Sequence, residues 1–108
     1  FTQAANGIIG LETSLPLALN LVRDGLIDPL RLLELMSSAP ADILKMQGGT
    51  LAVGSIADVT VIDPEKEFVF SEESILSKGK NSPFIDWPLQ GKAVLTIMGG
   101  RITHDELT

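Results

Sequence analysis

The chain has 108 residues, of which 44% are hydrophobic, so it can form one ordinary domain with a modest core and is not generally disordered. Its formal net charge of −6 argues against a nucleic-acid-binding surface, and no apolar run approaches the roughly 18 residues that span a bilayer. The chain contains no cysteine and no signal-peptide pattern, so a cytoplasmic location is expected.

The sequence begins with Phe1 rather than Met, which predicts a truncated, processed or partly ordered chain. Gly7 and Gly10 then flank two isoleucines in a flexible turn, and two interpretations of this turn stay open. Either the isoleucines pin the loop into a core, or the backbone around Asn6 and Gly7 faces a ligand.

Three helices are expected next. The first, over residues 15–22, is apolar on almost every side, which predicts burial from most directions and suits the wall of a larger body. Gly25 is placed to be the left-handed residue that ends it. A second helix begins after Asp28 as its cap and is broken at residues 37–40, and a short third helix covers residues 41–46.

The second half of the chain predicts strands. Residues 58–62 are rich in Val, Thr and Ile, so we expect a buried strand, which the following Asp63-Pro64 stops. Trp87 is expected to be a packing anchor. The remaining expected elements are strands at 68–70, 92–98 and 101–103, a helical turn within 71–77, a hairpin turn at Gly99-Gly100 and a frayed tail over 104–108.

Side chains that carry chemistry are scarce. A zinc site needs three or four converging ligands, and this chain has no cysteine and a single histidine, His104, in its expected tail. The acidic residues 63, 65 and 67 do not fit a calcium loop, because Phe68 and Ser74 stand where that loop needs a glycine and an acid. Phosphate-binding loops are absent too. Taken alone, the residues give no complete active site.

Five segments of the chain together resemble the C-terminal third of class I dihydroorotases, which belong to the cyclic amidohydrolase superfamily. They are GIIGLETSLPLALNLV (7–22), SSAPADILKM (37–46), GTLAVGSIADVTVIDP (49–64), SKGKNSPF (77–84) and LTIMGGRIT (95–103). The Gly-x-x-Ala-Asp pattern followed by hydrophobic residues at 54–62 is shared across the superfamily. The combination of Gly-Ile-Ile-Gly-Leu-Glu-Thr with Lys-Asn-Ser-Pro-Phe points more specifically to dihydroorotases.

The resemblance implies an α/β fold, in which C-terminal helices of a (β/α)8 TIM barrel are followed by strands of a small β-sandwich. Residues 1–47 would belong to the barrel and residues 48–108 to the accessory β-sandwich, completed by an N-terminal remainder of the same enzyme. The implied activity is the zinc-dependent interconversion of N-carbamoyl-L-aspartate and (S)-dihydroorotate in pyrimidine biosynthesis. The family's His-x-His and Asp-His-Ala-Pro-His motifs do not occur here. The chain alone would therefore lack the metal and catalytic residues and be inactive.

Asn6 and Gly7 match the positions at which the family contacts substrate mainly through the backbone, so the resemblance implies that they bind substrate. A homodimer and a complex with aspartate transcarbamoylase are the implied protein partners. Two alternatives stay open. The chain could belong to a degenerate dihydroorotase-like assembly partner of aspartate transcarbamoylase, or to a cyclic amidohydrolase of the hydantoinase or allantoinase type.

Overall fold

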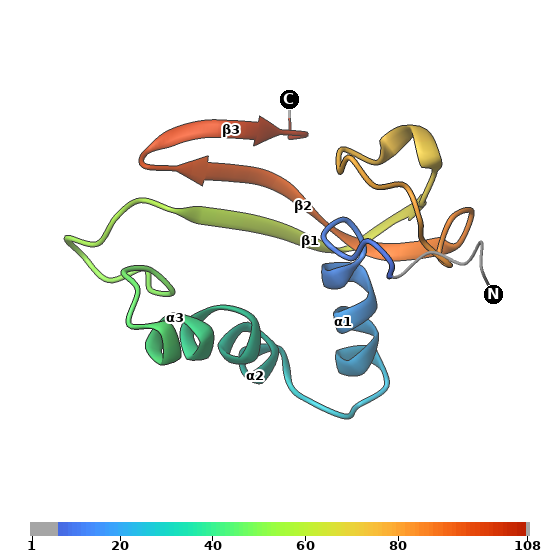
Figure 1. Cartoon of the computed structure of the whole chain (residues 1–108). Helices are drawn as coiled ribbons and strands as arrows, with labels where there is room; N and C mark the ends of the chain where they lie inside the picture. Colours follow the sequence, from blue (N-terminus) through green and yellow to red (C-terminus); the bar gives the residue numbers. More distant parts are fainter. Residues whose placement is uncertain (1–6, 108) are drawn as a thin grey trace.

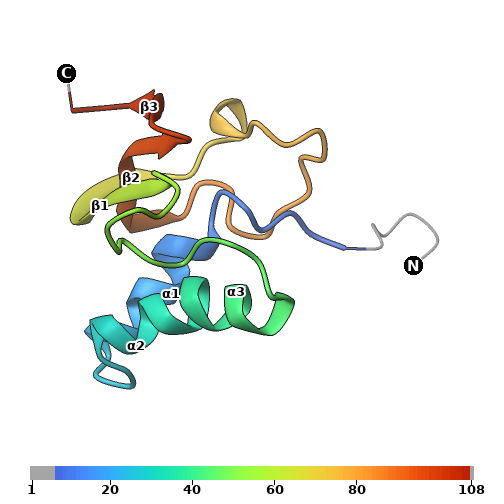
Figure 2. The same ribbon diagram turned by 90° about the vertical axis from the view of Figure 1, so that its left-hand side faces the viewer.

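The computed structural model describes residues 7–107, and its α-helices lie on one side of a small sheet (Figure 1). A view turned by 90° keeps the same two layers, with the helices below the strands (Figure 2). The three-stranded sheet is antiparallel in the order β1-β2-β3. The elements in chain order are α1 (Ser14–Arg23), α2 (Pro29–Leu33), the π-helix η1 (Glu34–Ser38), α3 (Ala39–Leu44), β1 (Val59–Val69), the 3-10 helix η2 (Glu72–Ser74), β2 (Pro88–Met98) and β3 (Arg101–Asp105).

Local signals fix the end of α1 and the start of α2, as the sequence predicts. Gly25 has φ +75°, and the N–H of Leu26 donates to the Leu21 carbonyl at 2.9 Å, as in a Schellman motif. The side chain of Asp28 accepts a hydrogen bond from the N–H of Arg31 at 2.8 Å and caps α2. Both predictions are confirmed.

The predicted break at residues 37–40 is wrong, because the helical path continues from α2 through η1 into α3. The N–H of Ala39 donates to the carbonyl of Glu34, five residues back, which is the hydrogen bond of a π-helix. Pro40 then falls in the first turn of α3, directly after the π-helical turn. The proline is accommodated by a π-helical turn instead of ending the helix.

A bulge explains why β1 is longer than predicted. Pro64 was expected to stop the strand, yet the strands predicted at 58–62 and 68–70 form one strand. Residues 64–66 lie opposite Gly91 alone, so pairing resumes beyond them with a shifted register. Because a bulged residue needs no ladder hydrogen bond, the proline is tolerated inside the strand.

The β2–β3 hairpin is confirmed, and the Ala57-Asp58 pair holds its turn. Gly99 and Gly100 have φ values of +57° and +82°, as a type I′ turn requires. A carboxylate oxygen of Asp58 accepts from the N–H of Gly99 at 2.8 Å, and the carbonyl of Ala57 accepts from Gly100 at 3.0 Å. Asp58 therefore precedes β1 instead of beginning it, and its side chain braces the hairpin. The strand β3 also reaches Asp105, so the tail predicted to fray from residue 104 is wrong at its start.

Arg23 and Gly91 join α1 to the sheet. The guanidinium Nη2 of Arg23 donates to the carbonyls of Pro64 at 2.7 Å and Gln90 at 2.9 Å, which places the end of α1 on the bulge. Gly91 has φ +100°, and a Cβ added there would lie 2.3 Å from Cδ1 of Leu19. The glycine therefore allows the helix to approach the sheet closely.

The core is small and lies where the sheet meets the loop around Ile9 and the residues that follow β1. It consists of Phe70, Ile75 and Leu89, with partly buried neighbours that include Ile9 and Phe84. Trp87 contacts Phe84 edge to face at 4.9 Å but is 48% exposed, so it anchors the packing only in part.

The strand predicted to be buried is partly exposed within the described chain, and the first helix leaves apolar faces uncovered, as suits the wall of a larger body. Val61, in the strand expected to be buried, is 39% exposed, and of the α1 residues only Pro16 is fully buried. The total accessible surface is 8177 Å², compared with roughly 5,800 Å² for an ordinary folded monomer of this mass. Much of the chain's apolar surface is therefore uncovered. Within residues 7–107, no helix is long and apolar enough to cross a bilayer.

Candidate functional site

The predicted substrate-binding loop is held by one residue from the second half of the chain. Asn6 lies outside the described residues, whereas Gly7 is described and exposed. The side-chain amide of Asn81 donates to the Gly7 carbonyl, and the main-chain carbonyl of Asn81 accepts from the N–H of Ile9 at 2.8 Å. Asn81 therefore forms hydrogen bonds with the loop at Gly7 and at Ile9, on either side of Ile8.

The two isoleucines of this loop differ in exposure, and the ligand-facing interpretation of Asn6 and Gly7 stays a prediction. Ile9 packs against the core and touches the Gly79 position, where an added Cβ would lie 3.2 Å from its Cγ2. Ile8 is 59% exposed, and a Cβ added to Gly7 would meet no described atom within 4 Å. Ile9 therefore anchors the loop to the core, while Gly7 and Ile8 are exposed.

Glu12 fixes the segment that carries Asn81. Its Oε1 accepts from the N–H groups of Leu76 at 3.2 Å and Ser77 at 2.9 Å, and from the Ser77 hydroxyl at 2.7 Å. The Ser77 hydroxyl, followed by the Ser77 N–H, lowers the pKa of the Glu12 carboxyl, because these bonds favour its charged form. Lys80 adds a hydrogen bond from its ammonium to the Ile75 carbonyl at 2.7 Å. The carboxylate is therefore an acceptor that orders residues 75–81.

These contacts join the two segments on which the more specific part of the family resemblance depends. Residues 7–13 and 77–84 are far apart in the chain but lie together through Asn81 and Glu12. Sequence reasoning missed both roles. The available signal was that Glu12 is the one acid of residues 7–13 and Asn81 the one amide of residues 77–84.

Residues 7–107 do not form a metal centre or a catalytic pair. No group of three or more His, Cys, Asp or Glu side chains among them is placed to hold a metal ion. His104 lies in β3, with Nε2 3.3 Å from a carboxylate oxygen of Glu106, which also forms ion pairs at 2.9 Å with Lys66 and Lys92. The hydrogen bonds from these lysines lower the pKa of Glu106 from its ordinary 4.5 to about 2. Through this cluster Glu106 joins β1, β2 and β3, which is a structural role.

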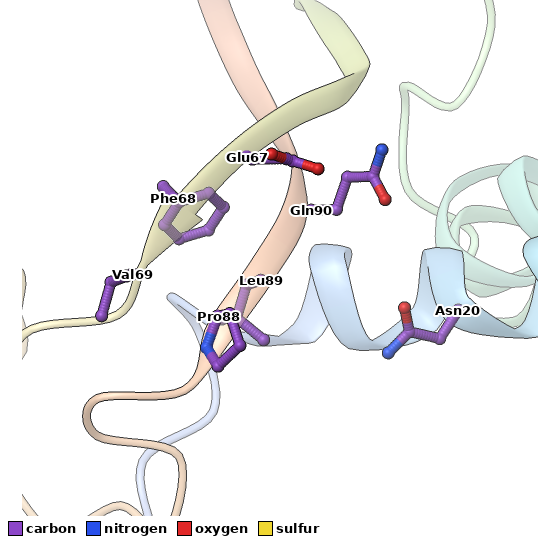
Figure 3. Close-up of a pocket in the computed structure, with 7 residues that line it drawn as sticks. All are labelled: Asn20, Glu67, Phe68, Val69, Pro88, Leu89 and Gln90. Carbon is purple, nitrogen blue, oxygen red and sulfur yellow. The ribbon is translucent and has the colours of Figure 1, made fainter.

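A cavity of about 550 Å³ lies between α1 and the sheet (Figure 3). Its walls come from α1, β1 and β2, and Glu67 is its one ionisable side chain, with the Gln90 amide near it and Asn20 apart from it on α1. A single acid without a basic partner or a nucleophile does not make a hydrolytic site. The loop at Gly7, which lies outside this cavity's lining, remains the candidate for substrate contact.

Comparison with known proteins identifies the family. Residues 3–103 match the sequence profile described as the Amidohydrolase family. The chain belongs to the amidohydrolase family. Among curated relatives of this amidohydrolase chain, the protein named Dihydroorotase from Desulfotalea psychrophila (strain LSv54 / DSM 12343) is 61% identical over 104 residues, which are 96% of this chain and 25% of that protein. The Dihydroorotase of Geobacter sp. (strain M21) is 51% identical, over 96% of this chain and 24% of that protein. The chain thus spans about a quarter of the length of these relatives.

Solved structures of similar proteins agree with the predicted fold class. The L-hydantoinase (dihydropyrimidinase) from Arthrobacter aurescens superposes with a TM-score of 0.87 at 39% identity, covering 95% of this chain and 24% of that one. A D-hydantoinase gives 0.84 at 30% identity, covering 94% and 23%. These likenesses confirm the predicted α/β fold class, with this chain forming one part of the amidohydrolase fold. The division at residues 47 and 48 stays a prediction.

Proposed function

We propose that this chain is the C-terminal part of a dihydroorotase, which interconverts N-carbamoyl-L-aspartate and (S)-dihydroorotate. The observation that carries the proposal is the 61% identity, over 96% of the chain, to a protein named Dihydroorotase. The similar hydantoinases reach 39% and 30% identity. The excess surface of the described chain supports the same proposal, because the apolar residues of α1, α2 and β1 would be covered by the rest of the enzyme.

The metal is proposed to be zinc. Residues 7–107 bring together no set of ligands that fits it, so the ligands and the chemistry at the metal belong to the rest of the enzyme. A cytoplasmic location is part of the same proposal. So are a homodimer and a complex with aspartate transcarbamoylase as alternative assemblies.

Asn6 and Gly7 are proposed to contact the substrate through their main chain. The support comes from Gly7, which is exposed and has open space where a side chain would project. A main chain without a neighbouring Cβ lets a ring with a carboxylate approach closely.

The activity is tested by comparing the full-length enzyme with the 108-residue chain. We expect the full-length protein to hydrolyse dihydroorotate and to bind zinc in stoichiometric amount, and the chain alone to do neither. Hydrolysis by the isolated chain would refute the assignment of the active site to the missing part. A full-length protein with intact metal motifs but no activity on any cyclic amide would favour the non-enzymatic assembly partner.

The likeness to hydantoinases favours a second candidate, a hydrolase of hydantoin-like rings. A panel of dihydroorotate, dihydrouracil, hydantoin and allantoin decides between the two. Under the main proposal, the kcat/KM for dihydroorotate exceeds that for each neutral ring. A preference for hydantoin or dihydrouracil would replace the main proposal with the second candidate.

The substrate contact is tested with Gly7→Ala in the full-length enzyme. The added methyl meets no described atom within 4 Å, so we expect folding to be unchanged and KM to rise about tenfold through the obstructed ligand. Gly10→Ala is the matched control, because its added methyl also meets nothing within 4 Å. Equal KM values for both variants and the unmodified enzyme would exclude a close approach at Gly7.

A further inference from the structure

We propose that Asn81 is a positioning residue, which sets the main chain of Gly7 for substrate binding from the segment 75–81. The inference rests on the proposed substrate contact at Gly7. Asn81 itself need not touch the substrate, because its contacts are with the main chain of the loop.

The two hydrogen bonds of Asn81 determine which polar group of Gly7 remains available. The Gly7 carbonyl accepts from the Asn81 amide, and the N–H of Ile9 donates to the Asn81 carbonyl at 2.8 Å. Among residues 7–107, no group accepts from the N–H of Gly7. The main chain therefore offers the substrate a donor, which suits a ring carbonyl or a carboxylate.

The segment 75–81, which carries Asn81, follows η2 and has no regular secondary structure, but several contacts fix its position. Three donors converge on the Glu12 carboxylate, and bonds to an ionised acceptor are stronger than neutral ones. Ile75 is buried in the core at the start of the segment, and Gly79 lies against Ile9. Because the segment is fixed, the hydrogen bond from Asn81 also fixes the position of the exposed Gly7.

Precise placement matters because the loop at Gly7 has few other restraints. Within residues 7–107, Gly7 and Ile8 have no packing partner comparable to that of Ile9, so the amide of Asn81 limits the rotation of the Gly7 peptide group. Without it, the N–H would lose its fixed direction. Substrate binding would then include the entropic cost of ordering the loop.

The test uses the full-length enzyme with Asn81→Ala and Asn81→Asp. Both remove the donor to Gly7 and keep the main-chain bond to Ile9, and the alanine variant does so without adding charge. We expect KM to rise about tenfold in each and kcat to stay within about twofold, because the contact is made equally with substrate and transition state. Asn20→Asp is the matched control, since its oxygen accepts from Arg23 and an aspartate can still do so. It is expected to leave KM unchanged.

Hydrogen exchange of the peptide that covers residues 7–13 supplies a readout independent of the substrate. We expect faster exchange in both Asn81 variants than in Asn20→Asp and the unmodified enzyme. Unchanged exchange, or unchanged KM in Asn81→Ala, overturns the inference. A fall in kcat that accompanies a loss of thermal stability also overturns it, because that pattern indicates a general structural role.

Failure of the proposed function would look different. If the enzyme hydrolyses another cyclic amide instead of dihydroorotate, the KM comparison is made on that ring and the inference about Asn81 is judged unchanged. If Gly7→Ala leaves KM unaltered, the proposed contact fails, and the inference that depends on it is overturned even where Asn81→Ala speeds exchange.

Discussion

Replacing Gly91 by alanine would strain the place where α1 meets the sheet. The residue has φ +100°, and a side chain in such a conformation costs about 1–3 kcal/mol. The new Cβ would also lie 2.3 Å from Cδ1 of Leu19, well inside van der Waals contact. Because that methyl ends a flexible side chain, we place the clash near the low end of overpacking costs, at about 1–2 kcal/mol.

A double-mutant cycle separates the clash from the backbone strain. Leu19→Ala removes the methyl that the new Cβ meets, so Gly91→Ala should cost about 1–2 kcal/mol less in that background. The measurement is hydrogen exchange of peptides from α1 and β2 in the full-length protein, where this coupling corresponds to roughly a 5- to 30-fold change in opening. Additivity within about 0.5 kcal/mol would refute the close approach of α1 to Gly91.

Other predictions concern the polar contacts. Asp58→Ala should speed exchange in the β2–β3 hairpin by removing the acceptor for the Gly99 N–H, a loss of about 1 kcal/mol, whereas Asp58→Asn keeps that acceptor and should not. Arg23→Ala should loosen α1 from the bulge by about 1–2 kcal/mol, and protection of α1 equal to the unmodified protein would contradict the contact. Glu106 has a lowered pKa, so its contribution to stability is complete above about pH 4.5 and disappears as pH falls toward about 2. Thermal melts between pH 5 and 3 should therefore show a smaller decline in Glu106→Gln than in the unmodified protein.

Predictions that depend on a few adjacent residues succeeded. Gly25 and Asp28 follow helix-ending and helix-starting rules whose hydrogen bonds span no more than a turn. The pair Gly99-Gly100 follows from the twist of two-residue hairpins. In each case the backbone conformation and its partner are encoded within six residues, so no knowledge of the tertiary fold was required.

Predictions that treated proline as a stop failed, for reasons that lie outside the local sequence. Pro40 is absorbed because the helix widens to a π-turn, and Pro64 because the facing strand offers Gly91 opposite a bulge. Neither the wider turn nor the facing residue can be read from the residues next to the proline. The local rule correctly states that proline is unfavourable inside a helix or strand. It does not show how the surrounding structure accommodates the proline.

The candidate site could be located from the sequence but not assembled from it. Glycine spacing and family resemblance drew attention to Gly7, and the Lys-Asn-Ser-Pro-Phe segment stood out as specific. That Asn81 of this segment reaches the Gly7 carbonyl is a contact across 74 positions. Sequence periodicity carries no information about such a pairing. Burial of the strand at 58–62 was overestimated for a similar reason, since an apolar run predicts that something covers it without saying what.

The helix α1 links the loop at Gly7 to the sheet. Glu12, just before it, binds the main chain of residues 76 and 77, and Arg23, at its last turn, binds carbonyls on β1 and β2. Both contacts use a charged side chain against main-chain groups, so they fix position even where the apolar packing is thin. The segment that presents Gly7 is therefore set relative to the sheet by the two ends of one helix. A change at Arg23 or Gly91 should then alter substrate affinity through α1. A change at Asp58, whose side chain bonds the hairpin turn and no α1 residue within residues 7–107, should alter stability alone.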